Sequence, residues 1–296
     1  MNDFKGLDLP EKPVIVWFRN DLRVSDNMAL TAAAQTGNPV IPLYVLEKDD
    51  ETVPLGGAQE WWLHHSLASL SNSLERLGAP LVLRRGEAAN ILKEIVDETG
   101  AGSVLWNRRY VPAQIKRDAA LKSDLRDSAL TVESFDGQLL HEPTQLKTGS
   151  GGPYRVYTPF WRSFSESCHP RLPIGAPKEL AGFKAKLVSD DLKSWSLLPT
   201  KPYWAGGIGE VWTPGEDGAQ ERLKHFLSDA LDGYADGRDF PGEEHTSKLS
   251  PHLAFGEISP FQIWAATEGS RGEVPDRDFT TYRKEVVWRE FSWHLL

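Results

Sequence analysis

The feature that most constrains the fold is a regular alternation of short apolar runs with helical patterns in the first half of the chain. Runs of β-branched and apolar residues, each bounded by turn residues, occupy 13–18, 39–46, 80–84, 103–106 and 130–135. Helical spacing between them is clearest over 56–78, in Leu63, Leu67, Leu70, Leu74 and Leu77, with Gly78 where a C-cap belongs. Strands that alternate with helices predict an α/β fold, with a doubly wound parallel sheet over residues 1–135 and ligands at the carboxyl ends of the strands.

The pattern changes at about residue 136. Proline and glycine crowd residues 136–210, where we expect an irregular connector. No predicted strand precedes the "GGIG" at 206–209, which favours a plain turn over a nucleotide-binding loop. Helical spacing returns with Leu223, Phe226, Leu227 and Leu231. Two helix starts follow, Ser250-Pro251 and Ser259-Pro260, each with Ser at the N-cap and Pro at the first helical position. Gln262 completes a capping box at the second start. The sequence predicts the start of an all-helical domain over 211–296.

Composition limits the kind of protein. With 296 residues, 40% of them hydrophobic and 25% charged, the chain is typical of a soluble globular protein with room for two domains. A single cysteine, Cys168, excludes a disulfide framework and fits a reducing compartment, and we interpret it as structural or neutral. The opening "MNDFKGLDLPEKP" lacks the pattern of a leader, no apolar stretch is long enough for a membrane span, and the histidines lack metal-ligand spacing. We therefore predict a cytoplasmic protein without a membrane partner or a metal, and we expect a monomer.

Charge and aromatic content point in different directions for nucleic-acid binding. The net charge of −9 argues against a broad basic surface, although a bound polyanion senses the local groove rather than the sum. Eleven tryptophans provide large rings suited to base stacking, but core packing is the commoner role of any single one.

Polar residues ahead of the predicted helix start at 250 form a candidate anion site. Thr246, Ser247 and Ser250 crowd a helix start whose first amides lack intrahelical partners, which suits a phosphate or diphosphate, and Lys248 would add positive charge. An ordinary cap at Ser250 explains the same spacing equally well, so both interpretations stay open.

The last sixteen residues, "TYRKEVVWREFSWHLL", predict a helix with two distinct faces. Val287, Phe291 and Leu295 form an apolar stripe, and Glu285, Trp288, Arg289 and Ser292 project from a single other face. A Glu285–Arg289 ion pair with Trp288 packed in the interior would explain the second face without any ligand. No stop signal follows the apolar stripe, so we expect further chain after Leu296.

Three separated motifs carry a resemblance to a known family. "WFRNDLRVSDNMAL" (17–30), the 234–260 segment and "EVVWREF" (285–291) together resemble the photolyase/cryptochrome family of flavoproteins, in the same order and over essentially the whole chain. The resemblance implies a Rossmann-like domain that carries an antenna chromophore, and a helical domain that holds FAD and is incomplete here. It places the electron-transfer tryptophans and the rest of the flavin and lesion pockets beyond residue 296. The polar loop "RNDLR" could simply start a helix through Ser25, but its place at the end of a strand favours a ligand.

The resemblance also implies roles for individual residues. Glu285 matches the active-site carboxyl that hydrogen-bonds a pyrimidine carbonyl, and Trp288 the aromatic on which a flipped-out dimer stacks. Arg238 and Arg289 match DNA contacts. An extruded dimer needs this combination of an aromatic plane and a polar partner. The implied FAD contacts are Tyr234, Thr246, Ser247, Lys248, Leu249, Ser250, Glu285 and Tyr282, the last in place of a Trp in the best-known members.

The implied activity is light-driven repair of cyclobutane pyrimidine dimers in DNA, by electron transfer from reduced FAD to the flipped-out dimer. A blue-light signalling cryptochrome without repair and a 6-4 photolyase are the alternatives within the family, and a nucleotide-binding protein without photochemistry is the alternative outside it. Many cryptochromes depart from the Glu285 and Trp288 pair, so its retention favours repair. Ala113 and Gln114 replace the Asn and Glu of some folate-carrying members, and we expect methenyltetrahydrofolate held in another way, with deazaflavin or an extra flavin as the alternative antenna.

Overall fold

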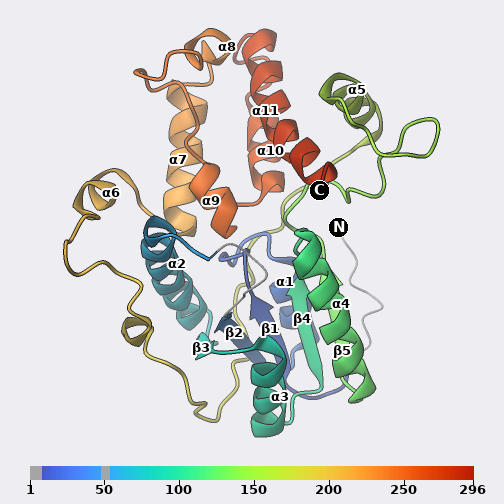
Figure 1. The fold of residues 1–296 in the computed structure, drawn as a ribbon, viewed down its shortest axis with the longest axis vertical. Coiled ribbons are helices and arrows are strands. Elements are labelled where there is room, and N and C mark those ends of the chain that lie inside the picture. The colour runs from blue at the N-terminus through green and yellow to red at the C-terminus, as the bar shows by residue number, and fades with distance from the viewer. Residues whose placement is uncertain (1–8, 48–53) are drawn as a thin grey trace.

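The first part of the chain is a five-stranded parallel sheet, as predicted. The computed structural model describes residues 9–47 and 54–296, so the start of the segment searched for a leader, residues 1–8, lies outside the described residues. The strands are β1 (Val14–Phe18), β2 (Val40–Leu46), β3 (Val82–Arg85), β4 (Ser103–Asn107) and β5 (Thr131–Phe135). They are ordered β3-β2-β1-β4-β5, with Val14 opposite both Val40 and Ser103 (Figure 1). The order reverses at β1, which makes its carboxyl end the switch point of the sheet.

Helices cover both faces of the sheet and confirm the doubly wound arrangement. They are α1 (Met28–Thr36), α2 (Gly57–Arg76), α3 (Ala88–Thr99) and α4 (Pro112–Asp127). Side chains of a strand alternate between faces, so Val14, Val16 and Phe18 join the core beneath α1 and α2. Ile15 and Trp17 join the core beneath α3 and α4. All five residues of β1 are buried, as expected of a central strand in a parallel sheet.

The helix ends confirm one prediction and correct another. The leucine pattern of α2 is confirmed, and the chain leaves this helix through Gly78, whose φ of 93° lies in the left-handed region. Helix α1 does not start through Ser25, as one interpretation had it. Asn27 is the N-cap and accepts a hydrogen bond from Leu30 N at 3.0 Å. Asp26 lies between Ser25 and this N-cap, and its φ of 52° is left-handed rather than helical, so the helix cannot extend back to Ser25.

The segment 136–210 is less irregular than predicted. It contains α5 (Tyr157–Ser167), the short 3-10 helix η1 (Leu192–Trp195) and the start of α6 (Gly206–Val211), which includes the "GGIG" expected to form a turn. Proline and glycine on both sides of α5 concealed this helix, and Pro159 is tolerated because it lies in the first turn. Phe160 and Phe164 of α5 are fully buried in the core of the helical part.

The helical part follows, with α7 (Glu216–Asp229), α8 (Tyr234–Gly237), α9 (Ser250–Phe255), α10 (Pro260–Gly269) and α11 (Asp276–His294). The capping box at Ser259 is confirmed, because Gln262 N donates to Ser259 Oγ at 3.0 Å and Ser259 N donates to Gln262 Oε1 at 2.8 Å. The N-cap predicted at Ser250 is wrong by one residue, since Leu249 holds that position and its side chain makes no capping bond. None of the helices in the described part of the chain combines the length and the hydrophobicity that crossing a membrane requires.

Buried polar contacts join the two parts around the loop that follows β1. Arg23 donates to Gly256 O at 2.8 Å and to Gly137 O at 3.0 Å. A Cβ on Gly256, whose φ is +68°, would lie 2.0 Å from Asn20 O, so the close approach of the chains requires glycine here. Within the α/β part, Arg19 of the same loop donates to Asp118 Oδ2 of α4 at 3.0 Å. The polar loop expected to bind a ligand thus also joins the two parts of the molecule through Arg23.

Candidate cofactor and DNA site

A cavity of 780 Å³ lies between the helical part and the α/β part. It is lined by all eight residues that the family resemblance had implied as cofactor contacts: Tyr234, Thr246, Ser247, Lys248, Leu249, Ser250, Tyr282 and Glu285. These residues come from α8, from the loop before α9, from the first position of α9 and from α11. The volume is typical of a small-molecule or cofactor site. Residues that lie up to about fifty positions apart in the sequence thus share one concave surface, which we call the first cavity.

Two tyrosines form an aromatic wall of the first cavity. The rings of Tyr234 and Tyr282 meet edge to face with centroids 5.3 Å apart, and both contact Phe226. Burial raises the pKa of Tyr234 to about 12 and raises the pKa of Tyr282 far above its usual value. Both phenols therefore stay neutral at physiological pH.

The loop before α9 has an unusual backbone. Lys248 has a φ of 52°, in the left-handed region that non-glycine residues rarely adopt. Its ammonium group forms an ion pair with Glu244, which lies on the exposed side of the loop. Backbone strain of this kind is concentrated at ligand sites, because the surrounding structure must hold it in place. Lys248 lines the first cavity, so this strained position belongs to its wall.

The polar face of α11 is divided between different partners. Glu285 pairs with Arg238, with Oε1 and Nη1 2.6 Å apart, so the interpretation as a Glu285–Arg289 helix pair is wrong. The hydrogen bond with Glu285 raises the pKa of Arg238. Arg289 lines the first cavity and donates from Nη1 to Gln138 O at 2.7 Å, and burial lowers its pKa. The side chain is half-buried, so the DNA contact implied for Arg289 stays a prediction.

Trp288 lies beside the first cavity rather than in its lining. Its ring stacks on Tyr157 with centroids 3.7 Å apart and an angle of 10° between the planes, and it meets Phe291 edge to face. The residue is 42% exposed, so the interpretation as interior packing is wrong. The apolar stripe on the other face holds for Val287 and Phe291, which are buried, but not for Leu295, which is exposed.

Among the lining residues not implied as cofactor contacts are Asn20, which belongs to the "RNDLR" loop expected to bind a ligand, and Tyr110, Gln138 and Trp293, which sequence reasoning missed. Trp293 lies four residues after Arg289 and eight after Glu285, so helical spacing alone could have placed it on their face. The other three come from the first half of the chain, where no local pattern connects them to α11. Gln138 Nε2 donates to Asn20 O at 3.0 Å, which fixes two of them together.

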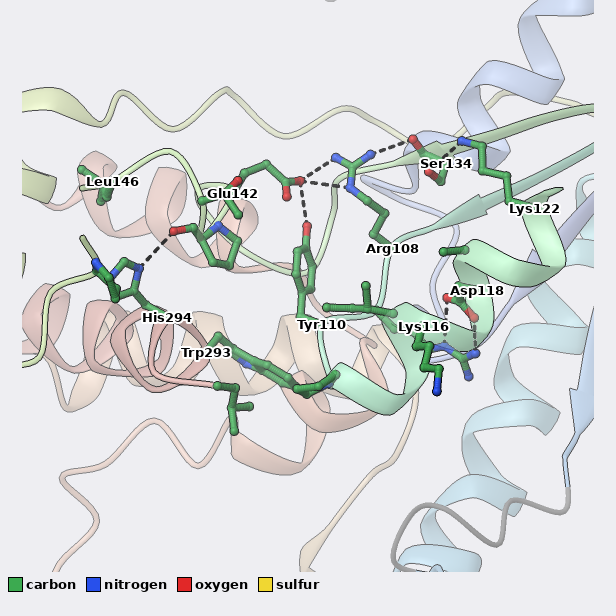
Figure 2. Close-up of a pocket in the computed structure, with 18 of the residues that line it drawn as sticks. Arg108, Tyr110, Lys116, Asp118, Lys122, Ser134, Glu142, Leu146, Trp293 and His294 are labelled. Atoms are coloured by element: carbon green, nitrogen blue, oxygen red, sulfur yellow. Dashed lines mark hydrogen bonds and ion pairs between the residues drawn. The ribbon is translucent and has the colours of Figure 1, made fainter. Parts of the chain in front are cut away.

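A second cavity of 830 Å³ adjoins the first, and Figure 2 shows its walls. Tyr110 and Trp293 line both cavities, with ring centroids 6.4 Å apart. Glu142 accepts hydrogen bonds from Tyr110 Oη at 2.9 Å and from Arg108 Nη2 at 2.5 Å. Lys116 and Lys122 of α4 add positive charge to a mainly apolar lining.

The fold and the first cavity define an α/β protein with an appended helical part and, between the two, a cavity large enough for a cofactor. The family model described as DNA photolyase matches residues 14–178, and the chain belongs to this family.

Similar proteins are found on both the photolyase and the cryptochrome side. The chain is 57% identical over 290 residues to the deoxyribodipyrimidine photo-lyase of Agrobacterium fabrum, across 98% of this chain and 60% of that protein. Identity to cryptochrome-1 of Arabidopsis thaliana is 33% over 301 residues, across 95% of this chain and 42% of that protein. The crystal structure of a bacterial class III photolyase from Agrobacterium tumefaciens matches with a TM-score of 0.94 at 56% identity, across 99% of this chain and 60% of that one. The chain thus spans 60% of the length of these Agrobacterium proteins.

Proposed function

We propose that the full-length protein is a DNA photolyase that repairs cyclobutane pyrimidine dimers with light. One observation carries the proposal. The first cavity gathers the eight implied FAD contacts, and one of them, Glu285, pairs with Arg238. Glu285 lies one turn of α11 before Trp288, which is exposed. A cofactor site and a base-stacking surface are therefore adjacent. The 57% identity to a deoxyribodipyrimidine photo-lyase supports the same conclusion.

The first cavity has the chemistry that FAD requires. The hydroxyls of Thr246, Ser247 and Ser250 suit a diphosphate, because hydrogen bonds to a charged acceptor are stronger than those between neutral groups, and Lys248 lines the same cavity. The aromatic wall of Tyr234 and Tyr282 suits a flat ring system. When bound, reduced and excited by light, FAD would supply the electron that splits the dimer. The residues of this chain hold the cofactor, orient it and exclude water.

The lesion side depends on Trp288, Glu285 and Arg238. A damaged base pair is the cheapest to extrude from a duplex, and the extruded bases need an aromatic surface and a polar partner. Trp288 offers the aromatic surface. Glu285 offers a carboxyl, which the ion pair with Arg238 holds in place. Arg238 keeps its positive charge beside this surface, where a DNA phosphate would approach.

The second cavity is our proposed site for the antenna, methenyltetrahydrofolate. Trp106, Tyr110 and Trp293 provide ring surfaces, while Lys116 and Lys122 suit the carboxylates of a folate tail. Deazaflavin is the alternative, and a cavity of 950 Å³ at the carboxyl ends of β1 and β2 would suit it. Mass spectrometry of the pigment released by acid from the full-length protein decides between them.

A cryptochrome without repair is the second candidate, since the chain is 33% identical to an Arabidopsis cryptochrome. The exposed indole of Trp288 favours repair, because it leaves an aromatic surface open to a base. For the full-length protein we also propose a monomer, and we propose the cytoplasm as its location because the single cysteine of this chain fits a reducing compartment.

The repair function is tested with two variants of the full-length protein. Trp288→Ala should weaken binding to dimer-containing DNA by roughly ten- to a hundredfold and binding to undamaged DNA far less, because stacking one base on an aromatic contributes about 1–3 kcal/mol. Glu285→Ala should lower the repair yield per absorbed photon even at saturating DNA, because its carboxyl is proposed to stabilise charge on the dimer. Filter binding and a repair assay under blue light measure these two effects.

Thermal unfolding of both variants is the control for stability. Normal lesion binding and full repair by both variants, with only a lower Tm, would sink the repair proposal and favour the cryptochrome.

A further inference from the structure

Tyr157 of α5 is attached to α11 at two points. Its ring stacks on Trp288 with centroids 3.7 Å apart and planes 10° from parallel. Its hydroxyl donates to Lys284 O at 2.6 Å, one helical turn before Trp288. The ring also meets Phe291 at 5.7 Å and an angle of 68°. Tyr157 therefore contacts both the turn before Trp288 and the turn in which Trp288 lies.

The stack fixes a side chain that would otherwise be free to change its rotamer. Trp288 is 42% exposed, and an exposed aromatic side chain on a helix has more than one allowed χ1. Burial against α11 alone does not select its plane. Tyr157 does, because parallel rings in van der Waals contact allow little tilt. Phe160 and Phe164 in turn anchor α5 in the helical core, so the Tyr157 ring has a rigid support.

We propose that Tyr157 is a positioning residue for lesion recognition, which sets the plane of Trp288 so that an extruded base of damaged DNA stacks on the indole. This inference rests on the proposed function. Tyr157 covers one side of the indole, and the accessible remainder receives the base, giving a continuous stack of Tyr157, Trp288 and base. Fixing the indole before binding removes the entropy cost of ordering it in the complex, which raises affinity without a new contact to DNA.

The test compares Tyr157→Ala and Tyr157→Phe in the full-length protein. The Ala variant removes the ring, and its ratio of affinities for dimer-containing over undamaged DNA should fall roughly two- to tenfold, the range expected from the loss of one aromatic pair. The Phe variant keeps the ring and loses only the bond to Lys284 O, so its ratio should stay within about twofold of the wild type. The slope of affinity against salt concentration should not change, because no phosphate contact is lost.

Tyr154→Ala is the matched control. Tyr154 lies in the same segment, and its ring contacts Phe160 and His294 instead of Trp288. Its removal should lower Tm without changing the affinity ratio.

Two outcomes would overturn the inference while Trp288→Ala still abolishes lesion preference. One is a wild-type affinity ratio in Tyr157→Ala. The other is tighter lesion binding by Tyr157→Ala, which would show that Tyr157 occupies the face of Trp288 that the base needs. If Trp288→Ala itself keeps the wild-type ratio, the stacking role in the proposed function fails, and the inference about Tyr157 fails with it.

Discussion

At the residue scale, three neighbours on one face of α11 have different environments, because each contacts a different part of the chain. Glu285, Trp288 and Arg289 are spaced three and four apart, so helix geometry places them together. Arg238 from the end of α8 meets Glu285, Tyr157 from α5 meets Trp288, and the Gln138 carbonyl meets Arg289. One face thus provides an ion-paired carboxyl, an exposed ring and a cation bound to a backbone carbonyl.

The reactivity of Cys168 is a test at the same scale. Burial, with a smaller contribution from the charge of Glu290, raises the pKa of the Cys168 thiol to about 11 from the ordinary 9.0. The thiolate is the reactive form, so at neutral pH the folded protein should be alkylated about a hundredfold more slowly than an ordinary thiol. Because the pKa is raised, the rate should keep increasing about tenfold per pH unit between pH 7 and pH 10. Iodoacetamide labelling followed by mass spectrometry measures this rate.

The urea-unfolded protein is the control, and its labelling rate should level off near the ordinary thiol pKa. A folded-state rate that levels off below pH 9 would contradict a raised pKa.

At the element scale, α9 is held by contacts from other elements. It has six residues, and a helix this short is not stable alone in water. Glu257, directly after its C-cap, is fully buried and accepts from Trp62 Nε1 at 2.9 Å, from Ser66 of the same helix α2, and from Gly215 N at 2.7 Å. His252 Nδ1 lies 2.5 Å from the other carboxylate oxygen. Glu257 therefore ties α9 and the cavity loop before it to α2.

Glu257→Ala should lower the free energy of unfolding by about 3–5 kcal/mol, because it leaves buried donors without their charged partner. Chemical denaturation of the full-length protein measures the loss. Arg277→Ala is the matched control, since its ion pair with Asp236 has side chains that are 67% and 72% exposed. The control should lower the free energy of unfolding far less than Glu257→Ala, because an exposed ion pair contributes little. Equal losses in the two variants would show that Glu257 is not an anchor.

At the scale of the whole molecule, we propose a division into residues 1–135, 136–210 and 211–296, with α5 packed in the helical core. Buried contacts cross between the parts. Glu216 of α7 accepts from Val24 N at 2.7 Å and from Ser25 N at 3.0 Å, and Asp26 accepts from Ser259 Oγ at 2.5 Å. An opening between the parts would leave these buried groups without partners. The parts should therefore unfold together.

Cooperative unfolding is tested in the full-length protein by two probes. Tryptophan fluorescence and far-UV circular dichroism should give coincident denaturation curves. Glu216→Gln should separate the two denaturation curves. The amide nitrogen of Gln cannot accept a hydrogen bond, so either Val24 N or Ser25 N, in the loop before α1, loses its partner. Wild-type curves with different midpoints would mean that the α/β part and the helical part unfold independently.

The sequence by itself determined the strands, most helices and the family. A run of β-branched residues, a leucine spacing or a capping box is local, and local patterns survive in any tertiary context that buries them. The capping box at Ser259 and the five strands were predictable for this reason. Resemblance to the family also identified the eight residues that converge on the first cavity.

Only the tertiary structure decided which of these residues meet, and what else meets them. Tyr157 is 131 residues from Trp288, Arg238 is 47 from Glu285 and Gln138 is 151 from Arg289. Helix α5 was hidden because proline and glycine flank it and its stability comes from burying Phe160 and Phe164 in a distant core. Contacts of this kind depend on how elements pack against each other. A local pattern carries no information about a partner that another part of the chain supplies, so the plane of Trp288 and the partner of Glu285 became visible only in the folded molecule.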